Sequence, residues 1–133
     1  MDRSGGQVMQ IDATGQELGI KRYPLTQESI ARSLATYIAM LLPSTILIKK
    51  SVLESVGGFD ERRKFADDYS LYMQLLIQGY RVQNMSDILA YYRQYPDNTT
   101  HSSTFAKDLE RLDIRHKYGK QLPGYLPGML YNI

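Results

Sequence analysis

The chain has 133 residues, no cysteine and a formal net charge of +2. A chain of this length forms one ordinary domain and buries a core without covalent staples. The absence of cysteine excludes disulfides and thiolate metal sites, and the nearly balanced charge gives no reason to expect a nucleic acid as partner. We therefore predict a single domain over residues 1–133.

The first third of the sequence predicts a short hairpin or an irregular strand, followed by a helix. Residues 7–12 alternate weakly between apolar and polar side chains, and residues 13–16 have the composition of a turn. Thr26 is a good N-cap for a helix over residues 27–37. The apolar side chains at helical spacing behind this cap are Ile30, Leu34 and Ile38.

The most apolar run of the chain is Tyr37–Ile48, which Pro43 interrupts. A membrane-spanning helix needs about 20 apolar residues, so this run is too short to be one. We interpret it as a buried segment with a strand over residues 45–48. The first ten residues lack the apolar stretch of a secretion signal. No transmembrane segment is therefore expected, and the expected location is cytoplasmic, with the inner face of the membrane as the alternative.

A short helix is predicted to follow this strand. Ser51 and Glu54 have the spacing of a capping box, in which each side chain bonds the backbone amide of the other residue. The helix should run to Val56. Gly57 lies where a glycine in a left-handed conformation would end it.

A second helix should open at Asp67 and Asp68 and run to about Gln78, with Gly79 ending it. Its apolar stripe consists of Leu71, Leu75 and Leu76, with Tyr72 beside them. Two candidate strands follow, at residues 80–83 and 88–92, separated by the turn-like residues 84–87.

The last third predicts one more helix and an irregular tail. Ser103 could cap a helix reaching Tyr118, with Phe105, Leu109 and Leu112 on one face. Beyond Gly119 the chain contains two Pro-Gly pairs, which disfavour regular structure. The apolar residues of the tail that could dock elsewhere are Leu126, Met129, Leu130 and Ile133.

The order of these elements resembles the C-terminal half of family 2 glycosyltransferases. The resemblance is carried by a strand, a short helix, Gly-Gly-Phe-Asp-Glu, an acidic pair, an amphipathic helix, a Gly-Tyr-Arg turn and a strand ending in Tyr-Tyr-Arg. The matching residues are 46–53, 57–61, 67–71, 75–81 and 88–93. They define a family-like block over residues 44–101, with a further helix and tail over 102–133, and residues 11–18 are similar to the linker that precedes the block.

The resemblance implies an α/β fold class, as an α+β fragment. The expected fold is the C-terminal half of the GT-A fold of nucleotide-diphospho-sugar transferases, with helices packed on a few short strands. It also implies that Asp68 is the general base that takes the proton from an acceptor hydroxyl. A carboxylate at a helix N-terminus is held ionised by the helix dipole and free amides, which suits this role. The structural alternative is an ordinary N-cap, which we keep open for Asp67 beside a role as substrate contact.

The remaining site residues are also implied by the resemblance. Besides Asp67, the expected substrate-binding residues are Gly57, Gly58, Asp60, Glu61 and Arg93. The two glycines allow close approach of a ligand, although a plain helix stop explains the first equally well. Asp60 and Glu61 could bond acceptor hydroxyls or simply be solvated. Arg93 lies where the family has an arginine near the nucleotide diphosphate, and Tyr95 stands where the family often has histidine.

Family members bind the nucleotide sugar through an N-terminal half that ends in Asp-x-Asp, whose carboxylates hold Mg²⁺ or Mn²⁺. This chain contains no Asp-x-Asp. We therefore expect a divalent metal in the full-length enzyme and no metal bound by this chain.

The first functional hypothesis is an inverting glycosyltransferase of polysaccharide biosynthesis, which transfers a sugar from a nucleotide-sugar donor to a saccharide or lipid-linked acceptor. This chain would supply the acceptor side and the base, and would be inactive alone. The alternative is a non-catalytic module that binds saccharide or a protein partner. Apolar faces left open at residues 45–48 and at Leu71 and Leu75 would favour a homo-oligomer.

Overall fold

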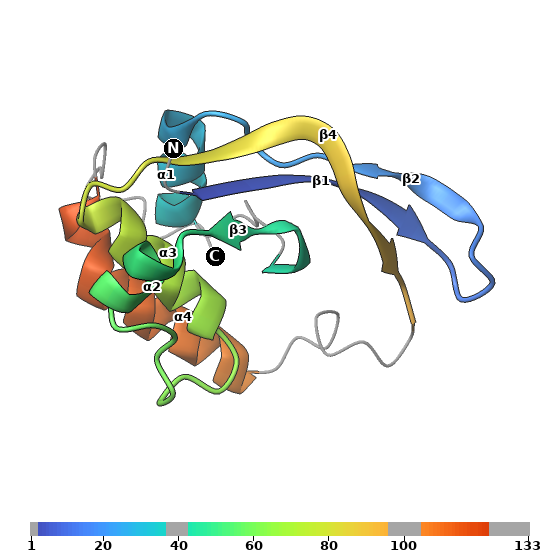
Figure 1. Cartoon of the computed structure of the whole chain (residues 1–133). Coiled ribbons are helices and arrows are strands. Elements are labelled where there is room, and N and C mark those ends of the chain that lie inside the picture. The colour runs from blue at the N-terminus through green and yellow to red at the C-terminus, as the bar shows by residue number, and fades with distance from the viewer. Residues whose placement is uncertain (1–2, 37–42, 96–104, 123–133) are drawn as a thin grey trace.

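The computed structural model describes residues 3–36, 43–95 and 105–122 (Figure 1). In chain order the elements are β1 (Arg3–Ile11), β2 (Glu17–Lys21), α1 (Gln27–Thr36), η1 (Pro43–Thr45), β3 (Leu47–Ile48), α2 (Lys50–Ser55), α3 (Asp67–Ile77), β4 (Val82–Arg93), α4 (Phe105–Tyr118) and η2 (Gly119–Gln121).

Strand β1 is the centre of a four-stranded mixed sheet. β4 runs parallel to β1 along one side, from Arg3 to Ile11. On the other side β3 pairs antiparallel with the start of β1, and β2 pairs antiparallel with its end. Helices α2, α3 and α4 gather near one end of this sheet, while β2 and the far ends of β1 and β4 extend away from them (Figure 1). The chain is therefore a mixed α/β structure, as the sequence predicted.

The hairpin between β1 and β2 is confirmed, and Asp12 forms its turn. One carboxylate oxygen of Asp12 accepts the backbone amides of Thr14 and Gln16 at 2.8 and 2.9 Å. The Thr14 hydroxyl donates to the same oxygen at 2.7 Å. These bonds hold the pKa of Asp12 below its usual value, the Thr14 hydroxyl contributing most.

The cap of α1 is also confirmed. Thr26 Oγ1 accepts the Ser29 amide at 3.2 Å, as an N-cap hydroxyl does. Ile30 and Leu34 are fully buried, and Ile38 lies outside the described residues. The described part of the helix runs to Thr36, and Tyr37, the predicted end, lies outside the described residues.

The predicted capping box at the start of α2 is wrong. The helix begins at Lys50, its N-cap is Lys49, and no side chain caps it. Ser51 therefore lies inside the first turn instead of at the cap. Lys50 and Glu54 instead face each other at i and i+4, with 3.7 Å between Nζ and Oε1. Both side chains are exposed, so this pair contributes little to stability.

The predicted turn at residues 84–87 is wrong as well, because β4 is continuous from Val82 to Arg93. The pairing with β1 moves from Gly5 opposite Asn84 to Gln7 opposite Ile88, so β4 contains an irregularity at this point. Two donor groups of Asn84 find partners there without leaving the strand. Asn84 donates through its backbone amide to Leu25 O at 3.0 Å and through Nδ2 to Pro24 O at 2.7 Å.

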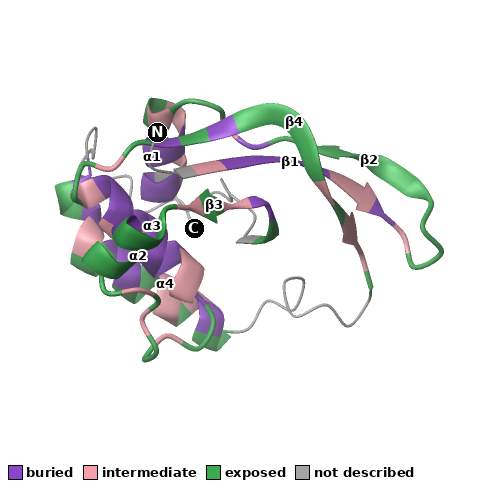
Figure 2. Ribbon diagram, in the orientation of Figure 1, coloured by how far each residue is buried: buried purple, intermediate pink, exposed green. Residues whose placement is uncertain are grey.

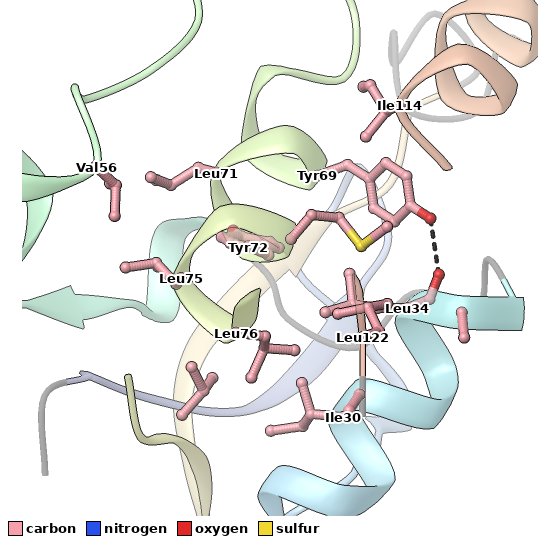
Figure 3. Close-up of a cluster of buried hydrophobic side chains, with 14 of the residues drawn as sticks. Ile30, Leu34, Val56, Tyr69, Leu71, Tyr72, Leu75, Leu76, Ile114 and Leu122 are labelled. Carbon is pink, nitrogen blue, oxygen red and sulfur yellow. Dashed lines mark hydrogen bonds between the residues drawn. The ribbon is translucent and has the colours of Figure 1, made fainter. Parts of the chain in front are cut away.

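The core lies between the helices and the adjoining end of the sheet (Figure 3). Leu71 and Leu75 of α3 are 4% and 0% exposed, so the predicted open stripe on this helix is wrong. The stripe is covered because side chains from several elements converge on it. The cluster contains Ile30, Leu34, Val52, Val56, Tyr69, Leu71, Tyr72, Met73, Leu75, Leu76, Val82, Ile114 and Leu122, among others.

Residues 45–48 were predicted to form a buried strand, but only part of this region is a strand and only part of it is buried. Thr45 belongs to η1 and is buried, while β3 consists of Leu47 and Ile48 alone. Leu47 is 75% exposed, because β3 pairs only with Arg3 and Ser4 at the start of β1. An open apolar side chain is therefore confirmed here.

The described part of α4 starts at Phe105, and the expected capping residue Ser103 lies outside the described residues. Among the described helices, none is long and apolar enough to cross a membrane.

One side chain connects three parts of this fold. Gln7 is 1% exposed, and its Oε1 accepts the Tyr23 amide at 2.5 Å. Its Nε2 donates to Tyr23 O at 3.3 Å and to Met85 O at 2.8 Å. The side-chain amide thus links β1, on which Gln7 lies, to the segment before α1 and to the irregular part of β4.

Replacing Gln7 with methionine should lower the free energy of unfolding by about 2–4 kcal/mol, because buried backbone groups would lose their partners. Urea denaturation measures this loss. Gln10→Met is the matched control, since Gln10 lies on the same strand and is only half-buried. A loss at Gln7 no larger than that at Gln10 would contradict the interpretation.

Gly6 is buried where β4 crosses closely over β1. A Cβ at this position would overlap Cγ and Cδ1 of Leu89 and lie 3.0 Å from Asp87 O. The Gly6→Ala variant should therefore be less stable by about 1–3 kcal/mol, the usual cost of overpacking. Thermal unfolding measures it. Combining Gly6→Ala with Leu89→Ala should recover part of the loss, and no recovery would show that Leu89 is not the obstacle.

Candidate functional site

The glycines at the start of the candidate site end α2 in the way the sequence predicted. Gly57 and Gly58 have φ of 82° and 72°, both in the left-handed region. The Gly57 amide donates to Glu54 O at 3.0 Å, and the Gly58 amide donates to Leu53 O at 2.9 Å. This pair of bonds is a Schellman motif. It uses both glycines to turn the chain sharply out of α2 and into the loop over residues 59–66.

Helix α4 holds this loop from the other side. The Glu110 carboxylate accepts the backbone amides of Lys64 and Phe65 at 2.7 and 2.8 Å, one on each oxygen. Asp113 accepts a bond from Arg63 Nη1 at 2.6 Å. Because these bonds involve ionised groups, they are among the stronger hydrogen bonds in proteins. The loop is therefore fixed at one end by α2 and in its second half by α4.

Asp60 is used within the loop itself. Its carboxylate accepts the Arg62 amide and side chain at 3.0 to 3.2 Å, and Arg63 Nε lies 3.5 Å from its second oxygen. The Asp60 side chain is only 10% exposed. The bond from the Arg62 side chain is the main cause that lowers the pKa of Asp60. This carboxylate therefore shapes the loop, while its neighbour Glu61 is exposed.

Asp67 and Asp68 are the first two residues of α3. The N-cap is Ala66 and no side chain caps the helix, so the alternative that Asp67 is the cap is wrong. Both carboxylates are half-buried. Asp68 Oδ1 accepts the Tyr69 amide at 2.7 Å.

The residues directly behind Asp68 are fixed in the core. The Tyr69 hydroxyl donates to Leu34 O of α1 at 2.7 Å, and the ring lies next to Ile114 of α4 (Figure 3). Burial raises the pKa of Tyr69 far above its usual value, so the hydroxyl stays protonated and remains a donor. Asp68 is thus attached to a rigid helix, which is the support that a catalytic or binding group requires.

Arg93 lies elsewhere. Its Nη1 donates to Asp12 O and Ala13 O at 3.1 and 3.0 Å, which joins the end of β4 to the β1–β2 turn. This end of the sheet lies away from α2, α3 and α4 (Figure 1). The described residues therefore bring Gly57, Gly58, Asp60 and Glu61 into one segment leading to Asp67 and Asp68, and they leave Arg93 outside it. His101 lies outside the described residues.

Four residues of this region were not singled out in the sequence. Arg62, Arg63, Glu110 and Asp113 build the loop and attach it to α4. A charged residue on a helix that is 45 positions away gives no local signal of such a contact. The loop is largely exposed in spite of these bonds (Figure 2).

The described residues contain no group of three histidine, aspartate or glutamate side chains placed to hold a metal ion. Searches of protein-family models, curated proteins and solved structures found no match to this chain.

The pairing of Asp60 gives a pH-dependent prediction. A carboxyl group whose pKa is lower in the folded protein stabilises the fold above its unfolded pKa of about 3.9. That contribution is lost as the pH falls through the folded pKa. Asp60→Asn should therefore be less stable than the wild type at neutral pH, and the difference should shrink below about pH 4.

Denaturation curves of both proteins across this pH range measure the effect. Glu61→Gln is the matched control, because Glu61 is exposed on the same loop. A difference between wild type and Asp60→Asn that stays constant as the pH is lowered would contradict the prediction.

Proposed function

We propose that this chain is the acceptor-binding side of an inverting glycosyltransferase of the GT-A type, similar to family 2. The single observation that carries the proposal is the ordered segment from Gly57-Gly58 to Asp67-Asp68, in which the acidic pair opens a helix that it does not cap. A helix-capping role would have explained the presence of Asp67 and Asp68 at this position without any role in binding or catalysis. With that role excluded for Asp67, the resemblance gives the better explanation of the pair.

In this proposal Asp68 is the general base. As the acceptor hydroxyl oxygen attacks the anomeric carbon, its proton passes to the Asp68 carboxylate, and the bond to the nucleotide diphosphate breaks with both electrons on the leaving oxygen. Attack from the face opposite the leaving group inverts the anomeric configuration. General-base assistance of this kind contributes about 10²–10⁴-fold to a rate.

The contacts of the other proposed site residues favour a different role for each of them. Glu61 is exposed and is the better candidate to bond an acceptor hydroxyl, whereas Asp60 is held by Arg62 and Arg63. Asp67 precedes the base in the same helical turn and is our proposed second contact to the acceptor. Gly57 and Gly58 form the turn that leads from α2 into the loop. Because neither has a side chain, the backbone at this turn is accessible to a ligand.

In this proposal these residues do not supply the donor side. Mg²⁺ or Mn²⁺ on a nucleotide diphosphate would neutralise the leaving group and prefers a set of oxygen ligands. The sequence has no Asp-x-Asp, and the described residues hold no such ligand set, so the residues present do not fit this metal. We therefore propose that the donor and its metal are bound by another part of a longer protein.

A non-catalytic module that binds saccharide or a protein remains the second candidate. Exposed apolar side chains on the sheet favour an interaction surface. They are Leu18, Ile20, Leu89 and Tyr91. A cytoplasmic location, or one at the inner face of the membrane, stays a prediction.

The two candidates differ in what Asp68 does. In a protein that carries both the donor half and this chain, Asp68→Asn should lower kcat for sugar transfer by about 10²–10⁴-fold. Its fold should be unchanged, because asparagine keeps the shape of the side chain. Transfer from labelled nucleotide sugars measures the loss. Asp87→Asn is the control, since Asp87 is exposed on β4 outside the proposed site.

The isolated chain should transfer no sugar with donor, Mg²⁺ and acceptor present. Sugar transfer by the pure chain would show that the donor half is not needed. If Asp68→Asn leaves transfer by the two-half protein unchanged, Asp68 is not the base. Saccharide binding at residues 57–68 without any transfer would favour the second candidate.

A further inference from the structure

Helix α4 contacts the chain on both sides of the acidic pair, Asp67 and Asp68. Before the pair, the Glu110 carboxylate accepts two backbone amides of the loop at 2.7 and 2.8 Å. After the pair, the ring of Tyr69 lies next to Ile114, which follows Glu110 by four residues on α4 (Figure 3). The acidic pair is therefore a short piece of chain between two contacts with the same helix.

The bonds of Glu110 lie directly before the start of α3. The two amides belong to Lys64 and Phe65, and the residue that follows them, Ala66, is the N-cap. Ala66 is 2% exposed, and no side chain caps the helix. A local capping side chain commonly fixes the first turn of a helix. Here the side chain that fixes the approach to the first turn comes from α4.

We propose that Glu110 is a positioning residue for the acidic pair, because its carboxylate determines where the first turn of α3 lies. The proposal rests on the function proposed above, in which Asp68 is the base. A base must lie within hydrogen-bond reach of the hydroxyl whose proton it takes. A displacement of about 1 Å at such a site can lower a rate about 10²-fold. Glu110 would therefore affect catalysis without touching the substrate.

The geometry of Glu110 suits a positioning role. Each of its two carboxylate oxygens accepts one amide, so the group holds the backbone at two points and fixes its direction. Bonds to an ionised carboxylate are roughly twice as strong as bonds between neutral groups. Glu110 is itself held in place, because Ile114 on the next turn of α4 is fully buried in the core.

Asp113 is the matched comparison on the same helix. It also contacts the loop, but its partner is the side chain of Arg63, three residues before the N-cap Ala66. The Asp113 side chain is 63% exposed, and exposed ion pairs contribute little to stability. The long side chain of Arg63 also separates this bond from the backbone. Loss of the Asp113 carboxylate should therefore loosen the loop without displacing the first turn of α3.

Amide hydrogen exchange in the 133-residue chain tests the positioning directly. Glu110→Gln keeps the size of the side chain but replaces one acceptor oxygen with a donor, and Glu110→Asp keeps the charge but shortens the reach. In both variants the amides of Tyr69 and Ser70 should exchange about tenfold faster, relative to the amide of Leu75 in the middle of α3. These two amides report the first turn, since they donate to the Asp68 carboxylate and to the carbonyl of the N-cap.

The control variant is Asp113→Asn, in which the ratio of exchange rates should stay close to that of the wild type. Because Leu75 is the internal reference, a loss of global stability alone leaves the ratio unchanged. Circular dichroism checks that each variant is folded. Unchanged ratios in both Glu110 variants would overturn the proposal, and so would an equal rise in Asp113→Asn.

The consequence for catalysis is measured in a protein that carries both the donor half and this chain. Glu110→Gln should lower kcat by about 10- to 100-fold and leave KM for the donor unchanged, since the donor is bound elsewhere. In the Asp68→Asn background the same substitution should cause no further loss, because the effects of groups that act as a unit are not additive. Losses that multiply would mean that Glu110 acts independently of Asp68, against the proposal.

Failure of this proposal and failure of the proposed function give different results. If Asp68→Asn alone leaves sugar transfer unchanged, the proposed function fails, while the exchange ratios still decide whether Glu110 positions the acidic pair. If Asp68→Asn impairs transfer and Glu110→Gln does not, the proposed function stands and the positioning role is wrong.

Discussion

The buried amide of Gln7 is the contact on which the arrangement of this fold depends. A glutamine amide has both donors and acceptors, and this one bonds backbone groups of Tyr23 and Met85. Through these bonds β1 fixes the start of the segment that leads to α1, and it fixes the irregular part of β4. Since α1 then packs on α3, the position of the candidate site depends indirectly on this one side chain. A buried polar group with satisfied bonds specifies a unique arrangement in a way that apolar contacts alone do not.

The parts of the fold that were predictable from the sequence are those with a local chemical cause. Thr26 caps α1, and Gly57 and Gly79 end α2 and α3 in left-handed conformations. The failures have distant causes. Residues 84–87 have the composition of a turn, yet Asn84 donates its backbone and side-chain amides to a segment some sixty positions earlier. Ser51 and Glu54 have the spacing of a capping box, but the N-cap is Lys49, so the helix starts two residues too early for it.

The candidate site divides in the same way. The place of Asp67 and Asp68 in the first turn of α3 follows from the amphipathic pattern behind them. The contact of the loop with Glu110 and Asp113 could not be predicted, because it joins elements 45 to 50 positions apart. The exposure of Leu71 and Leu75 was predicted wrongly for a related reason, since the side chains that cover them come from other elements, among them Ile114. Periodicity identifies which face is apolar, while the partner of that face is decided by the whole fold.

The bond from the Tyr69 hydroxyl to Leu34 O has a consequence for how the chain folds. It joins α3 to α1 across 35 positions of the sequence. This bond can form only after α1 and α3 have docked, so the part of α1 around Leu34 should become ordered together with α3. Local opening of α1 at Leu34 would break the same hydrogen bond that holds Tyr69, the residue next to Asp68, which makes these parts of the two helices one cooperative unit.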